Sequence, residues 1–126
     1  MRRLLIYFSL IHLLTFGSAI ASNLEIGNSI PEKFWGKWAS QMENCDKNHI
    51  QNLQIGATSL EFSKSSGTPV SVVLKNQKEL ALIVDFSGDG NEWIGFVHVK
   101  ISGDGSSLAD IKNSYAGNGF ARVKCR

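Results

Sequence analysis

The sequence predicts an all-β fold: a single small antiparallel up-and-down barrel of about eight strands, closed by one disulfide. Three observations predict it. Apolar residues alternate with polar ones over most of the chain, which is the pattern of strands with two different faces. Short turns separate the alternating segments, as in antiparallel neighbours. Two cysteines follow a secretory signal, which favours a disulfide. About eight such strands close most economically into a barrel.

The chain begins with a predicted secretory signal peptide, residues 1–21. Arg2 and Arg3 supply its positive charge, an apolar run follows, and Ala19 and Ala21 form a small-residue cleavage site. The apolar run is shorter than the ~20 residues that a membrane span needs. We therefore expect a periplasmic or secreted protein with no membrane span in the mature chain.

Removal of the signal peptide from the 126 residues leaves a mature chain long enough for one domain. We expect a polar leader over residues 22–33 and the β-barrel domain over residues 34–126. Without Arg2 and Arg3, 11 of the 13 basic residues remain against 11 acidic ones, and they are scattered singly. Nucleic-acid binding depends on clustered cations, so this composition argues against it.

The two cysteines of the chain, Cys45 and Cys125, are expected to form a disulfide, because the signal sends them to an oxidising compartment. The bridge would close a long loop, for which the chain-entropy estimate is about 4 to 5 kcal/mol of stabilisation. A reactive thiol or a metal-binding pair is the alternative, but the two cysteines lack the C-x-x-C spacing.

The expected strands follow from period-two alternation, which is clearest where Leu80, Leu82, Val84 and Phe86 share one face. Val70 is expected to share a face with the apolar residues two and four positions after it. No segment shows a sustained helical period. The eight expected strands are residues 34–40, 53–55, 60–62, 70–75, 79–86, 93–101, 108–111 and 120–125.

Four apolar residues fall on the outward side of their expected strands: Val73, Ile83, Ile94 and Phe96. Outward positions of a solvated barrel are usually polar. One interpretation is an exposed apolar patch, which usually marks a contact surface. The other is that Gly95 marks a bend or bulge that reverses the two faces. The sequence leaves both open.

The tetrapeptide Ser-Gly-Asp-Gly occurs at residues 87–90 and again at residues 102–105. With Asp85, Ser87 and Asp89 at positions one, three and five and Gly90 at position six, the first copy resembles half of a calcium loop. However, the position of the final bidentate acid is Phe96. Asp-Gly between alternating strands is typical of a hairpin. We therefore predict two hairpin turns and no cofactor, with calcium as the alternative.

We predict that the protein is not an enzyme and has no catalytic or metal-binding residues. His49 and His98 are the histidines of the mature chain, and neither has an identifiable nucleophile as a partner. Asp85, Asp89 and Glu92 cluster around one expected turn, where solvated carboxylates are common. Nothing in the pattern selects two of them as a hydrolytic pair.

The stretch "FWGKWAS" at residues 34–40 contains Gly36 and Trp38 in the G-x-W spacing. It resembles the first strand of small lipocalin-like (calycin-type) barrels. This resemblance implies that the glycine lets the strand bend and that the tryptophan closes one barrel end. It also implies that Arg122, on the last strand, packs across the indole. The combination of signal peptide, small barrel and one disulfide is also similar in architecture to bacterial periplasmic lysozyme inhibitors.

The leading functional hypothesis is a non-enzymatic binding protein that acts on a protein partner, for example an envelope hydrolase that it inhibits. Its candidate binding surface consists of Trp35, Ile94 and Phe96, because strand alternation turns Trp35 outward when Trp38 points inward. The alternative is a lipocalin-like carrier of a small apolar ligand. In a carrier, a central cavity would be lined by Leu82, Val84, Phe86, Trp93 and Val97.

Overall fold

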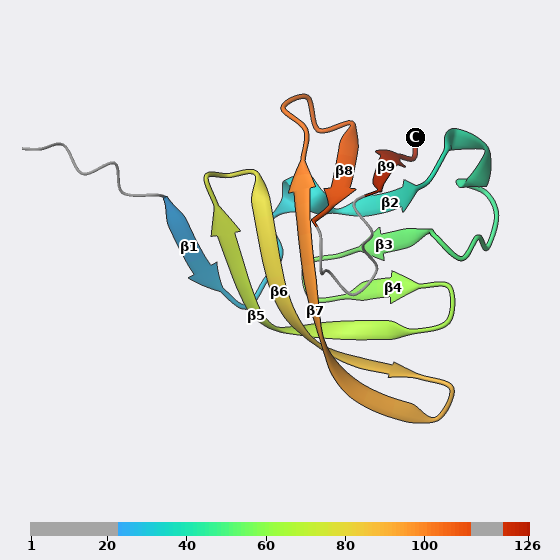
Figure 1. Cartoon of the computed structure of the whole chain (residues 1–126), viewed down its shortest axis with the longest axis horizontal. Helices are drawn as coiled ribbons and strands as arrows, with labels where there is room; N and C mark the ends of the chain where they lie inside the picture. Colours follow the sequence, from blue (N-terminus) through green and yellow to red (C-terminus); the bar gives the residue numbers. More distant parts are fainter. Residues whose placement is uncertain (1–22, 112–119) are drawn as a thin grey trace, which may run out of the picture.

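The computed structural model describes residues 23–111 and 120–126, so the expected signal peptide lies outside the described residues. The described chain forms a closed antiparallel barrel of eight strands, β2 to β9 (Figure 1), which confirms the predicted fold class. Each barrel strand pairs with the next along the chain, and β9 pairs with β2 to complete the ring.

The barrel strands differ greatly in length, and the longest three are consecutive. β5, β6 and β7 form a tall antiparallel sheet, while the strands on the other side of the barrel have only three or four residues. The elements are β1 Leu24–Gly27, η1 Glu32–Phe34, β2 Gly36–Ala39, η2 Met42–Asn44, β3 Leu53–Ile55, β4 Leu60–Phe62, β5 Ser66–Lys75, β6 Glu79–Gly88, β7 Asn91–Ile101, β8 Ser107–Asp110 and β9 Ala121–Lys124.

A ninth strand, β1, lies in the segment expected to be a polar leader and sits outside the ring. It pairs with the end of β5, with Ile26 opposite Val73, where the short β4 no longer reaches (Figure 1). The backbone N–H of Asn76 donates to the carbonyl of Asn23 at 2.8 Å. Farther along the same segment, Ile30 is fully buried. The leader is therefore part of the folded domain.

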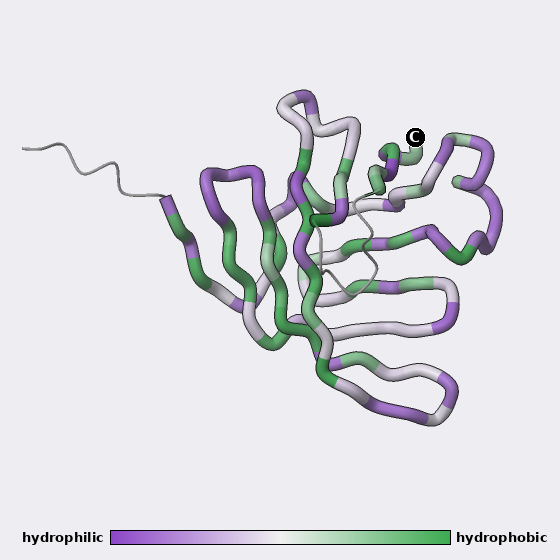
Figure 2. Tube along the Cα trace, in the orientation of Figure 1, coloured by the Kyte–Doolittle hydropathy of each residue, from purple (hydrophilic) through white to green (hydrophobic). Residues whose placement is uncertain are grey.

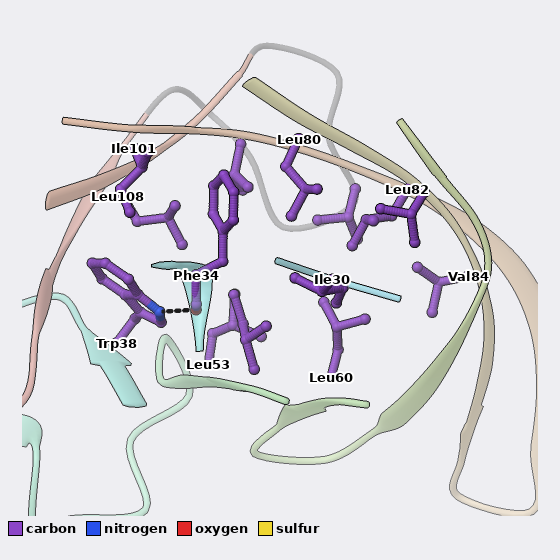
Figure 3. Close-up of a cluster of buried hydrophobic side chains, with 14 of the residues drawn as sticks. Ile30, Phe34, Trp38, Leu53, Leu60, Leu80, Leu82, Val84, Ile101 and Leu108 are labelled. Atoms are coloured by element: carbon purple, nitrogen blue, oxygen red, sulfur yellow. Dashed lines mark hydrogen bonds between the residues drawn. The ribbon is translucent and has the colours of Figure 1, made fainter. Parts of the chain in front are cut away.

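The barrel interior is filled by its own side chains (Figure 3). Phe34, on η1, and Trp38, on β2, are both fully buried, and the Trp38 indole N–H donates to the Phe34 carbonyl at 2.9 Å. This hydrogen bond satisfies a polar group that would be costly to bury alone. Around the two rings pack Ile30, from the segment between β1 and η1, and inward residues of the strands, among them Leu53, Leu60, Leu80, Leu82, Val84, Val97, Val99, Ile101 and Leu108.

The inward row of β5 differs from the expectation at one residue. The register between β5 and β6 shifts between Pro69 and Ser71, so the extra residue Val70 leaves the inward row and is exposed. A bulge of this kind places two residues of one strand opposite one of its partner. The shift expected as an alternative at Gly95 does not occur, because the register of β6 and β7 is continuous there.

The predicted disulfide between Cys45 and Cys125 is present, with an S–S distance of 2.04 Å. It joins the loop after β2 to the residue after β9, two strands that are neighbours in the ring. Beside it, the Cys125 backbone N–H donates to the Lys37 carbonyl at 2.9 Å. The bridge therefore reinforces the seam at which the barrel closes.

Replacing both cysteines with serine (Cys45→Ser/Cys125→Ser) should lower the free energy of unfolding by about 4 kcal/mol, because the unfolded chain regains the entropy of a long open loop. Urea denaturation of the oxidised protein and of the variant would measure the difference. Adding reductant should shift the midpoint of the native protein but not that of the variant. Equal midpoints for the two oxidised proteins would contradict a stabilising role.

Candidate functional site

Gly36, the glycine of the G-x-W spacing, has a backbone conformation that favours glycine. Its φ is +118°, a conformation that side chains rarely adopt, and an added Cβ would lie 3.4 Å from the Cε atom of Lys124. Two residues later Trp38 points into the core, directly across the barrel seam from Lys124. The glycine therefore permits the positive φ at the start of β2 and lets the Lys124 stem lie close to this strand.

Arg122 differs from the expectation that it packs across the Trp38 indole. Its guanidinium carbon lies 4.3 Å from the centre of the Phe120 ring, and the ring of Trp38 is covered by the Lys124 ammonium at 5.5 Å. The Arg122 side chain is directed by Asp110, whose two carboxylate oxygens each accept from Nη1 at 2.9 Å. A buried carboxylate attracts a guanidinium more strongly than an indole face does.

The Asp110–Arg122 pair is a charge pair inside the barrel wall, with both side chains only 1% exposed. Arg122 Nε also donates to the Gln51 carbonyl at 2.8 Å, so the pair fastens the loop before β3 to β8 and β9. Burial raises the pKa of Asp110, and the nearby Arg122 charge opposes this rise. Sequence reasoning missed Asp110, although an acid two residues after Leu108, on the same inward row of a strand, signals a buried partner.

Replacing Arg122 with methionine should lower the free energy of unfolding by about 3 to 5 kcal/mol at neutral pH, because the Asp110 carboxylate is left buried without a partner. This loss of stability should shrink as the pH falls. In the folded variant the buried, unpaired Asp110 has a pKa above that of the unfolded chain, so it becomes protonated and neutral first in the folded state. Urea denaturation at several pH values would measure it. The double variant Arg122→Met/Asp110→Leu should recover most of the stability, and failure to do so would contradict the ion-pair explanation.

Both Ser-Gly-Asp-Gly segments form hairpin turns, as predicted. In the first, Asp89 and Gly90 have φ values of 51° and 78° between the paired residues Gly88 and Asn91, which is the two-residue turn favoured by Asp-Gly. In the second, the Asp104 carboxylate is held inside its own turn. Its Oδ1 atom accepts hydrogen bonds from the Ser102 and Ser106 hydroxyls at 2.7 Å and from the Ser106 backbone N–H at 3.1 Å.

The hydrogen bonds in this turn predict that the stability of the protein depends on the protonation of Asp104. The Ser102 hydroxyl, followed by the Ser106 hydroxyl and N–H, lowers the pKa of Asp104 from 3.8 to about 2. A depressed pKa in the folded state means that the stabilisation is complete above about pH 4 and is lost as the pH falls toward 2. Carboxyl chemical shifts followed by NMR titration would measure the pKa. A pKa of Asp104 near its usual value would contradict this prediction. So would an Asp104→Asn variant whose free energy of unfolding falls at acid pH as much as that of the native chain.

The histidines occupy separate parts of the molecule. His49 lies in the loop before β3, where its Nδ1 accepts from the Gln51 backbone N–H at 3.1 Å. His98 is on the outer face of β7, 3.6 Å from a Glu79 oxygen and beside the Phe96 ring. Within residues 23–111 and 120–126, no group of three or more histidine, cysteine or acidic side chains is placed to hold a metal ion.

Of the four apolar residues expected on the outer face, Ile83, Ile94 and Phe96 are exposed, as the first of the two sequence interpretations expects, but Val73 is half-buried where β1 pairs with β5. Ile94 is 65% exposed and Phe96 is 44% exposed, while the residues between and after them point inward. Ile83 lies directly opposite Phe96 on β6 and is 47% exposed. Val70, displaced by the bulge of β5, is also exposed. We call these four residues the apolar patch: Val70, Ile83, Ile94 and Phe96.

Trp35 does not join the apolar patch. It precedes β2, which β8 and β9 separate from β7 in the ring. Its indole N–H donates to the Ile30 carbonyl at 2.8 Å, and the side chain is 38% exposed. The contact is with the segment before β2, which weakens the case for Trp35 as a binding residue. The structure thus divides the candidate surface, leaving Ile94 and Phe96 together and Trp35 apart.

The side chains expected to line a ligand cavity pack against one another instead. Leu82, Val84, Phe86 and Val97 are fully buried members of the core cluster. Trp93, at the edge of this cluster, stacks on Phe86 with ring centres 5.6 Å apart. A hollow of about 870 Å³ lies outside, between the β4–β5 turn and the tip of the β6–β7 hairpin. Its lining is mainly polar and includes Glu61, Lys64, Ser66, Ser87, Asn91 and Glu92.

No protein-family model matches the chain, and no curated protein or solved structure shows detectable similarity to it. Among the helices in the described part of the chain, none is long and apolar enough to cross a membrane. The function must therefore be inferred from the residues of this chain itself.

Proposed function

We propose that this protein is a non-enzymatic binding protein that recognises a protein partner through the outer face of β5, β6 and β7. The observation that carries the proposal is the apolar patch. Four large apolar side chains from three neighbouring strands are held in water, at positions where a barrel with a fully solvated exterior would carry polar residues. Exposed apolar residues that are contiguous usually mark a contact surface.

The strands that carry the patch suit it to recognition. β6 pairs with β5 and β7 along nearly its whole length, so Ile83 sits in the middle of a sheet held on both edges. Neighbouring cross-strand pairs place Phe96 beside Ile83, and Ile94 beside Asp85. A surface that is already ordered loses little conformational entropy when it binds. Aromatic and branched side chains on such a surface are typical anchors of protein interfaces.

The packing of the core favours this proposal over the alternative of a small-ligand carrier. A small eight-stranded barrel can be filled by its own side chains. Here Ile30 and Phe34 enter from the segment before β2 and occupy the interior together with Trp38 (Figure 3). An apolar ligand would have to displace buried side chains that already contact one another, and this would cost the energy of their packing.

The partner proposed is an extracytoplasmic protein, with an envelope hydrolase as the example to be tested first. Support comes from the predicted signal peptide and from the disulfide, which is typical of oxidising compartments. It also comes from the architectural resemblance to periplasmic lysozyme inhibitors. The G-x-W segment, with Gly36 at a positive φ and Trp38 in the core, supports the resemblance to lipocalin-like barrels. Fold likeness alone does not identify the partner.

The double variant Ile94→Ser/Phe96→Ser should bind the partner about 30-fold more weakly, because truncating a central apolar anchor usually costs about 2 kcal/mol or more. The purified chain would be immobilised, exposed to an envelope extract of its own host and washed. Retained proteins would be quantified by mass spectrometry, beginning with the cell-wall hydrolases, and the affinity measured on the purified candidate.

Ile50→Ser is the matched control, because Ile50 is also a highly exposed apolar residue but lies in the loop before β3, away from the patch. It should retain the partner as the native chain does. A set of retained proteins that is identical for the native chain and the double variant would contradict the proposal. Native mass spectrometry of the secreted protein with a small apolar molecule bound would favour the carrier instead.

A further inference from the structure

The outer face of β5, β6 and β7 carries opposite charges at its two ends. Along the backbone of β6 and β7, apolar residues lie between the polar residues of the two turns (Figure 2), and the cross-strand register places the apolar patch between the two charged ends. At one end, near the β5–β6 turn, are the exposed side chains of Lys75, Lys78 and Lys100, which we call the basic end. At the other, toward the tip of the β6–β7 hairpin, are those of Asp85, Asp89 and Glu92, which we call the acidic end.

The cross-strand register fixes this arrangement. Lys75 and Lys100 flank Glu79 in one row, and the Glu79 carboxylate lies 3.6 Å from the imidazole of His98. Asp85 lies opposite Ile94, and Glu92 lies opposite Ser87 two residues nearer the tip. Lys75, Asp85, Glu92 and Lys100 share the outward parity of their strands with Ile83, Ile94 and Phe96, so these charges lie on the same face as the apolar residues, and the turns add Lys78 and Asp89 at its two ends.

Such a surface is complementary to a copy of itself in one orientation. A two-fold axis that lies in the contact plane and runs perpendicular to the strands would stack apolar patch on apolar patch. It would also bring the basic end of each copy against the acidic end of the other. An axis parallel to the strands would put like charges together, which is costly. Most homodimers use this kind of symmetric, self-complementary contact.

We propose that the outer face of β5, β6 and β7 binds a second copy of this chain about that perpendicular two-fold axis. The inference deepens the proposed function, on which it rests, because it names an occupant for the same binding surface. Pairing would cover Ile83, Ile94 and Phe96, whose exposure is unfavourable in an isolated chain. A different partner would then bind in competition with the second copy.

Two charge-reversal variants test the pairing. Lys78→Glu/Lys100→Glu makes the basic end acidic, and Asp85→Lys/Glu92→Lys makes the acidic end basic. Each variant alone would meet its own copy with like charges, so its dimer dissociation constant should rise about tenfold or more relative to the native chain. Mixed in equal amounts, the two variants should form a heterodimer, because every contact between the charged ends is again of opposite sign. Sedimentation equilibrium of the mature chain over a wide concentration range would measure all three.

The control is Asp46→Lys/Lys47→Glu, which reverses two exposed charges in the loop before β3 and should dimerise like the native chain. Circular dichroism would establish that each variant is folded. If a variant is not folded, the salt dependence of the native chain replaces it as the test: raising the salt concentration should weaken the native dimer, because salt screens the charges at its two ends. A native chain that stays monomeric at every concentration, or a variant mixture that does not recover the dimer, would overturn the inference.

The two proposals fail in different ways. Suppose that the native chain stays monomeric and binds an envelope partner, and that the variant Ile94→Ser/Phe96→Ser loses this partner. The proposed function then stands and the self-association is wrong. If the charge variants behave as expected but no envelope protein depends on the apolar patch, the surface serves only self-association. In that case the proposed recognition of another protein is wrong.

Discussion

Closure of the ring at β9 is the constraint on which the rest of the structure depends. β9 pairs with β2 at only two positions, Trp38 with Lys124 and Ala39 with Val123. Such a short ladder gives few hydrogen bonds, and the structure supplements it with interactions of other kinds. The disulfide covers one side of the seam and the Lys124 ammonium covers the Trp38 ring, while the Arg122 ion pair joins β9 to β8 and to the loop before β3. Covalent, cation–π and ionic contacts therefore converge at a seam whose ladder has only two residue pairs.

Closure also explains why the candidate function lies outside the barrel. The interior of a ring of eight strands is small, and the segment before β2 contributes Ile30 and Phe34 to it. With Trp38 these residues fill the space at the closed seam, and the long strands fill the remainder. Ile83, Ile94 and Phe96 lie outside because strand alternation turns them away from this core. An isolated barrel gains nothing from this exposure, so it is most economically explained by a surface that is covered on binding.

The distribution of strand length separates structural from functional roles. The short strands β2, β8 and β9 carry the G-x-W segment and the buried ion pair, and the disulfide joins the loop after β2 to the residue after β9, so these features together hold the barrel closed. The long strands β5 to β7 are held by the two longest ladders of the barrel, β5 with β6, interrupted by one bulge, and β6 with β7, without a register shift. β6 and β7 extend beyond the ring as a hairpin (Figure 1), and together with β5 they present a wide outer face. Recognition on this face would leave the closing seam undisturbed.

The sequence by itself determined the all-β class, the Asp-Gly hairpins, the disulfide and the inward rows of β6 and β7, because these depend on local alternation and on turn chemistry. Only the tertiary structure decided the rest. The bulge at Val70 and the absence of a shift at Gly95 depend on cross-strand pairing, which local sequence does not specify. The partner of Arg122 depends on which strands meet in the ring, and β8 supplies Asp110 there. The division of the candidate surface has the same cause, since Trp35 and Phe96 are equally apolar in sequence but lie on different sides of the closed barrel.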